Sequence, residues 1–383
     1  MEPRDPHEAH RAATPLELLF DLCFVVAVAQ AASRLHHGLA EGHTADALMG
    51  YGLVFFAIWW AWMNFTWFAS AYATEDPSYR LMVLVQIAGA LVVAAGIPRA
   101  FEAVDFGVVT LGYAILRVGL VANWLRAARS DPPRRRTALR YALGLTSCQA
   151  GWLLLLTLPH ERWILGWLFL APAEILVPYW AERAHPTPWH AHHITERYGL
   201  FVIIVLGESV LAATVAVQKA MDAGEAVARL AGCIVGGLLI FFSLWWIYFD
   251  RPAHKFLVSN REGFVWGYGH FLIFASAAAI GAALGVSVDV LTGHARVSPW
   301  AAGLSVAVPV AVFLLCVYQL AVRPLEKGLL HTTAFFGAAI LVLLAAASAW
   351  AVLLIGFILT ALVAVQPGLK ALGSSSPPAP SGR

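Results

Sequence analysis

Several ionisable side chains of this chain stand inside long apolar segments, where water cannot solvate them. Glu17 and Asp21 are four residues apart in the first segment, so a helix places them on one face. Arg197 and Glu208 lie together in a later segment. A charged group inside a membrane is costly unless it is paired, protonated or hydrated, and such groups mark ion paths and proton relays. These residues therefore predict a site that binds and exchanges protons or cations.

The later segment carries its polar residues on one stripe of a helix. Helical spacing aligns His193, Arg197, Ile204 and Glu208, and Glu196 lies beside them. Glu208 is about 16 Å beyond Arg197 along the helix axis, near the middle of a bilayer. There it either exchanges protons or makes a buried structural hydrogen bond, and the sequence leaves both interpretations open.

A third candidate, Glu174, lies between two prolines. Pro172 and Pro178 have no N–H to donate to the carbonyls four residues earlier, so they free backbone acceptors, including that of Glu174 itself. Discontinuous helices build ion sites in transporters from such freed carbonyls. A kinked helix whose Glu174 bonds to a neighbouring helix explains the pattern equally well.

Arg117 is an isolated cation in another apolar segment and requires a counter-ion. Asp21, Glu174 and Glu208 are the candidates, and we interpret Arg117 as one half of a structural ion pair. His270 is interpreted as a core histidine whose hydrogen bonds are satisfied.

Other interpretations of the polar residues are less specific. Glu17 and Asp21 also suit the start of a helix, where the dipole favours negative charge. His190, His192, His193 and Glu196 are typical of a membrane entry, and we predict neither a metal site nor a cofactor. No nucleophile–base constellation is present, so an enzyme is not predicted.

Twelve membrane spans are predicted to position these residues. Hydrophobic residues make up 60% of the chain and charged residues 13%, which indicates a bilayer rather than water as the main solvent. Backbone groups in lipid must be satisfied internally, which favours helices. The predicted spans are 16–35, 46–72, 78–98, 104–125, 137–158, 161–182, 194–217, 225–249, 262–287, 298–322, 331–347 and 349–366. The last two could instead form one long helix.

Positive charge predicts the orientation of these spans. A cluster of arginines surrounds the loop after the fourth span: Arg126, Arg129, Arg134, Arg135, Arg136 and Arg140. Basic loops remain on the cytoplasmic side, so both termini are predicted to be cytoplasmic.

An internal repeat predicts two parallel halves of six spans each. The repeated block comprises Phe55, Phe56, Trp59 and Trp60 in the second span and Phe241, Phe242, Trp245 and Trp246 in the eighth, with Asp250 opposite Asn64. The predicted domains are a cytoplasmic N-terminal tail 1–15, repeats 16–183 and 194–366, a cytoplasmic linker 184–193 and a disordered tail 367–383.

Three stretches resemble the bacterial low temperature requirement A family: Leu16 through Val25, Arg80 through Phe101, and His193 through Ser209. The resemblance covers essentially the whole region of the spans. It implies an integral membrane protein linked to growth in the cold, with no established substrate.

The function predicted from these features is a proton- or cation-linked transporter or channel that uses intramembrane carboxylates. The ion-path candidates are Glu17, Asp21, Glu174, His193, Glu196, Arg197 and Glu208. The expected partners are the lipids of the inner (plasma) membrane and an unknown ion or small solute, and no nucleic acid. The alternative is a non-transporting scaffold or a sensor of lipid order and cold.

Overall fold

The computed structural model describes residues 1–6, 8, 11–102, 104–225, 227–326 and 328–374, and every regular element in them is helical. Two compact units divide the chain: Met1–Arg34 with Met49–Ile204, called unit 1, and Leu35–Leu48 with Val205–Arg383, called unit 2. The predicted linker between repeats, 184–193, overlaps the first three residues of α7 (Ala191–Asp222), whereas the division into compact units falls farther along that helix.

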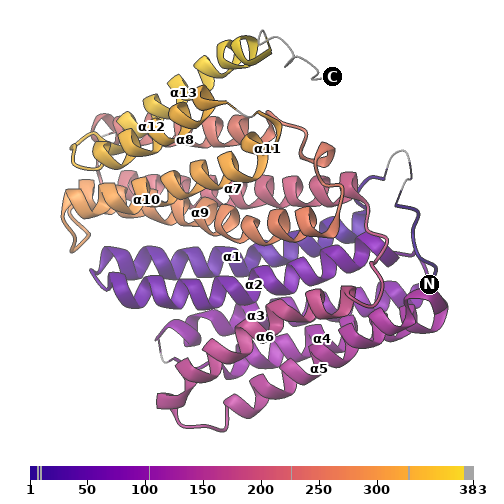
Figure 1. Cartoon of the computed structure of the whole chain (residues 1–383). Helices are drawn as coiled ribbons and strands as arrows, with labels where there is room; N and C mark the ends of the chain where they lie inside the picture. The colour runs from indigo at the N-terminus through magenta and orange to yellow at the C-terminus, as the bar shows by residue number, and fades with distance from the viewer. Residues whose placement is uncertain (7, 9–10, 103, 226, 327, 375–383) are drawn as a thin grey trace. The chain divides into compact units, whose positions relative to one another are not determined.

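The helices that contribute to unit 1 are long and apolar. They are α1 (Pro15–Ala40), α2 (Thr44–Tyr72), α3 (Pro77–Glu102), α4 (Gly107–Ser130), α5 (Arg135–Leu155), α6 (Trp163–Glu182) and the first part of α7. Helices α3, α4, α5 and α6 pack in chain order, each against the next. Figure 1 shows these elements in indigo to magenta.

Unit 2 contains the remaining helices. They are α8 (Val227–Phe249), α9 (Asn260–Thr292), α10 (Pro299–Val317), a π-helical turn Tyr318–Val322, α11 (Arg323–Leu325), α12 (Leu329–Ala345) and α13 (Ala351–Ser374). Helix α9 packs on α10, α10 on α12, and α12 on α13. This order matches that of α3 to α6 in unit 1, but the duplication of a six-helix unit itself stays a prediction.

Each of the twelve predicted spans corresponds to a helix of its own. Ten helices within the described residues are long and apolar enough to cross a membrane, and α5 and α12 fall short of that criterion. Turns at 346–350 separate α12 from α13, so the region predicted as either one or two helices contains two. Helix α13 continues to Ser374 and so includes residues 367–374 of the predicted tail. Residues 375–383 of that predicted tail lie outside the described residues.

Small residues bring α3 and α4 into close contact. Gly89 and Gly112 face each other, and a Cβ atom on Gly112 would lie 2.5 Å from the backbone nitrogen of Val93. Gly119, one heptad after Gly112, would place its Cβ 2.5 Å from the carbonyl oxygen of Met82. Helices associate in lipid through such close backbone approach. This packing fixes the part of α4 that carries Arg117.

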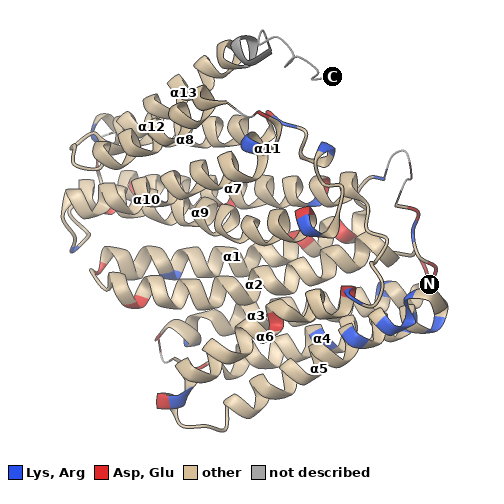
Figure 2. Ribbon diagram, in the orientation of Figure 1, with Lys and Arg blue, Asp and Glu red and all other residues tan. Residues whose placement is uncertain are grey.

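The connections between α2 and α3, between α4 and α5, and between α6 and α7 lie at one end of unit 1. Arg126 on α4 donates to both carboxylate oxygens of Asp76 at 2.8 Å, and Arg134 donates to the carbonyl of Pro186 at 2.9 Å. Figure 2 shows the basic residues gathered where α4 ends and α5 begins. The orientation of this end toward the cytoplasm stays a prediction.

Asp76 predicts a pH-dependent contribution to stability. Burial opposes its charged form, but hydrogen bonds from Arg126 and the α3 backbone lower its pKa from 3.8 to about 2. The stabilisation is therefore complete above pH 4 and is lost as the pH falls toward 2. We expect Asp76→Asn to lower the free energy of unfolding by up to about 1 kcal/mol at pH 7. The difference from wild type should shrink between about pH 4 and pH 2.

Unfolding in detergent, followed by tryptophan fluorescence at pH 7 and pH 2.5, measures this difference. Glu75→Gln, a change at an exposed neighbour, is the control. A loss in Asp76→Asn that is equal at both pH values would contradict the prediction.

Candidate functional site

Helix α1 begins with a capping box that orients the first carboxylate. Glu17 Oε2 accepts from the backbone N–H of Thr14 at 2.7 Å, and the Thr14 hydroxyl accepts from the backbone N–H of Glu17 at 3.3 Å. Pro15 occupies the first helical position, where its missing N–H costs nothing. This reciprocal pairing satisfies two free donors. The interpretation of Glu17 as a helix-entry charge is therefore supported, and the same carboxylate has further partners.

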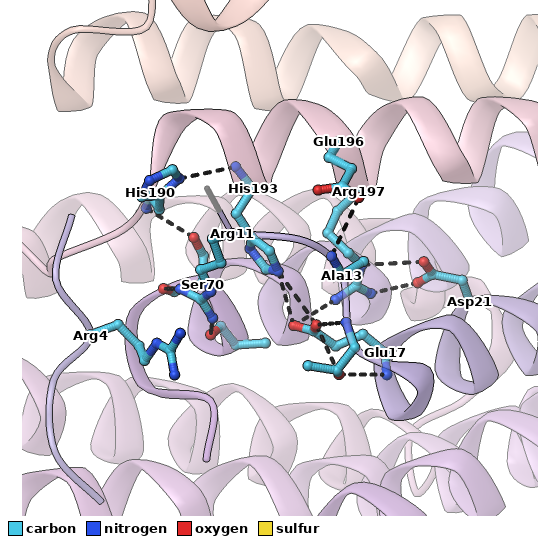
Figure 3. Close-up of polar contacts among 12 residues, drawn as sticks. Arg4, Arg11, Ala13, Glu17, Asp21, Ser70, His190, His193, Glu196 and Arg197 are labelled. Atoms are coloured by element: carbon cyan, nitrogen blue, oxygen red, sulfur yellow. Dashed lines mark hydrogen bonds and ion pairs between the residues drawn. The ribbon is translucent and has the colours of Figure 1, made fainter. Parts of the chain in front are cut away.

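Arg197 on α7 binds both carboxylates of α1. Its Nη2 lies 2.6 Å from Asp21 Oδ1, its Nε donates to Asp21 Oδ2 at 3.2 Å, and its Nη1 lies 3.2 Å from Glu17 Oε1. The two-pronged contact with Asp21 uses the planar fork of the guanidinium. Figure 3 shows the arrangement. The prediction that Glu17 and Asp21 share one face of a helix is confirmed.

His193 completes this group, which we call the α1–α7 cluster: Glu17, Asp21, His193 and Arg197. Its Nε2 lies 3.3 Å from Glu17 Oε1, one helical turn before Arg197 on α7. The four residues are at most 1% exposed. The sequence therefore located the members of this cluster, but it did not assign the partner of each.

An aromatic side chain of α2 supplies a further hydrogen bond to the cluster. Trp62 donates from Nε1 to Asp21 Oδ1 at 2.7 Å. The guanidinium of Arg197 lies 5.8 Å from the centre of the Phe65 ring, within the range of a cation–π contact. Asp21 thus accepts hydrogen bonds from three donors. Sequence reasoning missed this role of Trp62, because a tryptophan in a span is more typical of packing.

Arg11 in the N-terminal tail was missed as well. Its guanidinium is buried and donates to the backbone carbonyls of Ala69 and Ser70, at the end of α2. Cations stabilise the last turn of a helix because the carbonyls there carry partial negative charge. The predicted tail 1–15 is thus anchored near the cluster. Sequence reasoning did not find this role, because Arg11 lies in a polar tail outside every predicted span.

A second buried ion pair in unit 1 joins α4 to α6. Arg117 Nη2 donates to Glu174 Oε2 at 2.5 Å, and Trp60 and Trp152 donate to the two oxygens of Glu174 at 2.8 and 3.2 Å. The Arg117 guanidinium also lies 5.0 Å from the centre of the Tyr113 ring. Arg117 thus forms an ion pair, with Glu174 as the counter-ion. Neither Asp21 nor Glu208 takes that place.

The repeated aromatic block behaves differently in its two copies. In unit 1, Trp60 is fully buried and donates to Glu174, whereas its counterpart Trp246 in unit 2 is 54% exposed. Trp59 is buried too, whereas its counterpart Trp245 is 48% exposed. Burial in a helical bundle depends on which neighbours the fold supplies, and identical residue types cannot reveal it.

The remaining candidates lie apart from the α1–α7 cluster. Glu196 is half-buried and accepts from the backbone N–H of Ala13 at 3.4 Å. Glu208 is half-buried in the unit 2 part of α7, and within the described part of the chain it has neither a hydrogen-bond nor an ion-pair partner. His270 is buried and bonds to Trp266 and Tyr248, as predicted for a core histidine.

The carboxylate and guanidinium groups of the α1–α7 cluster are unequal in number. Two carboxylates face one guanidinium, which leaves one negative charge unless the imidazole is protonated. Arg11 adds a positive charge nearby, but its donors are directed at the carbonyls of α2. Histidine is the side chain that ordinarily changes charge near neutral pH. His193 Nε2 and Glu17 Oε1, 3.3 Å apart, are close enough to interact through a proton. Over the residues that the structure describes, no three His, Cys, Asp or Glu side chains form a metal-binding group.

Comparisons with known proteins agree with the resemblance seen in the sequence. The family model described as "Bacterial low temperature requirement A protein (LtrA)" matches residues 12–366. The chain is also 30% identical over 275 residues to the uncharacterized protein RA0937 of Rhizobium meliloti (strain 1021). That alignment covers 67% of this chain and 65% of the relative, just under two thirds of its length.

Proposed function

This chain belongs to the bacterial low temperature requirement A family, whose description names no substrate, and we propose that it is a proton- or cation-linked transporter or channel. The proposed location is the plasma membrane, with multiple spans and cytoplasmic termini. The α1–α7 cluster is its proposed ion-binding site.

The observation that carries this proposal is the pairing of two carboxylates with a single buried guanidinium. A purely structural ion pair needs only one carboxylate for each arginine, as Arg117 and Glu174 illustrate. Glu17 and Asp21 carry one more negative charge than Arg197 neutralises, and His193 offers a nitrogen that can carry a proton. The positive charge of the nearby Arg11 is directed at the carbonyls of α2. Buried ionisable groups of this kind mark ion and proton pathways in membranes.

Flux through proteoliposomes tests the proposal. Purified protein is reconstituted, proton and potassium gradients are imposed, and dyes sensitive to pH and to potassium report flux. Glu17→Gln is the most informative variant, because glutamine preserves the capping box while it removes the charge. We expect Glu17→Gln and Asp21→Asn each to reduce flux at least about tenfold, equivalent to about 1.4 kcal/mol in the barrier.

Glu75→Gln is the matched control, because this exposed carboxylate lies in a connection at the end of α2. Its flux should equal that of the wild type. If folded wild-type protein carried neither ion under any gradient, the transport proposal would fail in favour of the scaffold or sensor. Flux that persisted in both cluster variants would reject the α1–α7 cluster as the site.

A further inference from the structure

Unit 1 contains a cavity of about 360 Å³ among α2, α4, α5 and α6. Met49 and Trp163 line it near the ends of α2 and α6, and Trp60 and Glu174 line it farther along the same helices. Each pair is separated by eleven residues, which corresponds to about 16 Å of helix. The cavity therefore extends from the ends of the helices to the level of the Arg117–Glu174 ion pair. This volume is within the range of small-molecule sites, roughly 300–1,000 Å³.

The walls of the cavity are aromatic and aliphatic. Flat rings come from Phe56, Trp152 and Trp167, and Leu53 and Ala57 contribute aliphatic surface. Trp152 and Trp167 meet edge to face, with ring centres 6.0 Å apart. Such walls favour an apolar molecule of aromatic or branched shape.

The Arg117–Glu174 ion pair at the inner end of the cavity disfavours charged ligands. Glu174 lines the cavity and is neutralised by Arg117 at 2.5 Å. A bound cation would be repelled by Arg117 and a bound anion by Glu174, and both repulsions are strong where water is scarce. The ion pair therefore favours a ligand without net charge.

Glu174 nevertheless has hydrogen-bonding capacity left. Among the residues that the structure describes, its Oε2 accepts from Arg117 and Trp60, whereas its Oε1 accepts one long bond, 3.2 Å, from Trp152. A carboxylate oxygen has about two acceptor positions. Since Glu174 is only 1% exposed, the remaining acceptor has no access to bulk water. A ligand that carries a donor would satisfy it.

We propose that this cavity binds an uncharged, largely apolar molecule that donates one hydrogen bond to Glu174, of the class of phenols and hydrophobic alcohols. This inference goes beyond the proposed ion transport, because it concerns a neutral ligand and residues outside the α1–α7 cluster. Apolar walls provide the affinity for the body of the ligand, and Glu174 provides selectivity for its hydroxyl group.

Equilibrium dialysis tests the proposal with three probes of similar shape: 4-propylphenol, 4-propylanisole and (4-propylphenyl)trimethylammonium. The full-length protein is held in detergent micelles, and a matched cell with detergent alone corrects for partitioning. We expect saturable binding of the phenol, at least about tenfold tighter than that of the ether, because hydrogen bonds to charged acceptors are the stronger ones. The ammonium probe should bind more weakly than the phenol.

Ala57→Phe locates the site, because a ring at this position fills the cavity. Phenol binding should fall at least about tenfold in this variant and stay unchanged in Leu111→Phe, which adds a ring to an exposed position of α4. Thermal unfolding shows whether each variant is folded, and the comparison of probes in wild type does not depend on the variants. Equal affinity for the phenol and the ether would overturn the proposal, because the cavity would then be only an apolar space for detergent or acyl chains. Tighter binding of the ammonium probe, or phenol binding unaffected in a folded Ala57→Phe variant, would also overturn the proposal.

Discussion

Replacement of Arg197 by methionine is expected to lower the free energy of unfolding by about 3–5 kcal/mol, because a buried pair loses its cation. Glu17 and Asp21 would then face each other without the guanidinium that now contacts both. Methionine approximates the volume of the arginine stem, so the loss reports mainly the charge. Unfolding in detergent, followed by tryptophan fluorescence, measures the change. Arg197→Lys should fall between wild type and Arg197→Met, since a single ammonium cannot reproduce the two-pronged contact with Asp21.

Arg80→Met is the control for this experiment. Arg80 is exposed and lies 3.5 Å from Glu75, a geometry in which an ion pair is worth about 0–1 kcal/mol. If Arg197→Met were as stable as Arg80→Met, the carboxylates of the cluster would not depend on Arg197 for neutralisation. The proposed charge balance at the ion site would then be wrong.

The second large effect is expected at the Arg117–Glu174 pair, where the double variant should lose less stability than the single variant Arg117→Met. Arg117→Met alone leaves a buried carboxylate without its counter-ion, at a cost of about 3–5 kcal/mol. Arg117→Met combined with Glu174→Gln removes both charges, and the amide oxygen can still accept from Trp60 or Trp152. Most of the lost stability should return in the double variant. Two nitrogens of Arg117, Nε and Nη1, lack hydrogen-bond partners among the described residues. The free energy of removing these donors from water is therefore not recovered in the native pair.

A double-mutant cycle measures this coupling from unfolding of wild type, both single variants and the double variant. The exposed pair Arg80→Met and Glu75→Gln serves as the reference cycle, with an expected coupling of about 0–1 kcal/mol. Additive losses at Arg117 and Glu174 would show that the two charges do not interact in the folded protein. The argument that the cavity holds a neutral ligand would then lose its basis.

The sequence by itself determined the helical class and the approximate position of each helix. A bilayer demands long apolar helices, and their hydrophobicity is a property of each segment alone. It also selected Glu17, Asp21, His193 and Arg197, because an ionisable residue in an apolar segment is conspicuous without any tertiary information. Helical periodicity correctly placed Glu17 with Asp21, since residues four apart share a face in any helix.

Only the tertiary structure decided which helices supply the partners. Glu174, rather than Asp21 or Glu208, pairs with Arg117. Trp62 donates a hydrogen bond to Asp21, and Arg11 donates to a carbonyl at the end of α2. These contacts join residues that lie between about forty and 180 positions apart, so they depend on the packing of helices and not on local periodicity. The same principle explains why Trp60 is buried while Trp246 is exposed. A helix determines which residues share its face, and the packed neighbours decide what that face contacts.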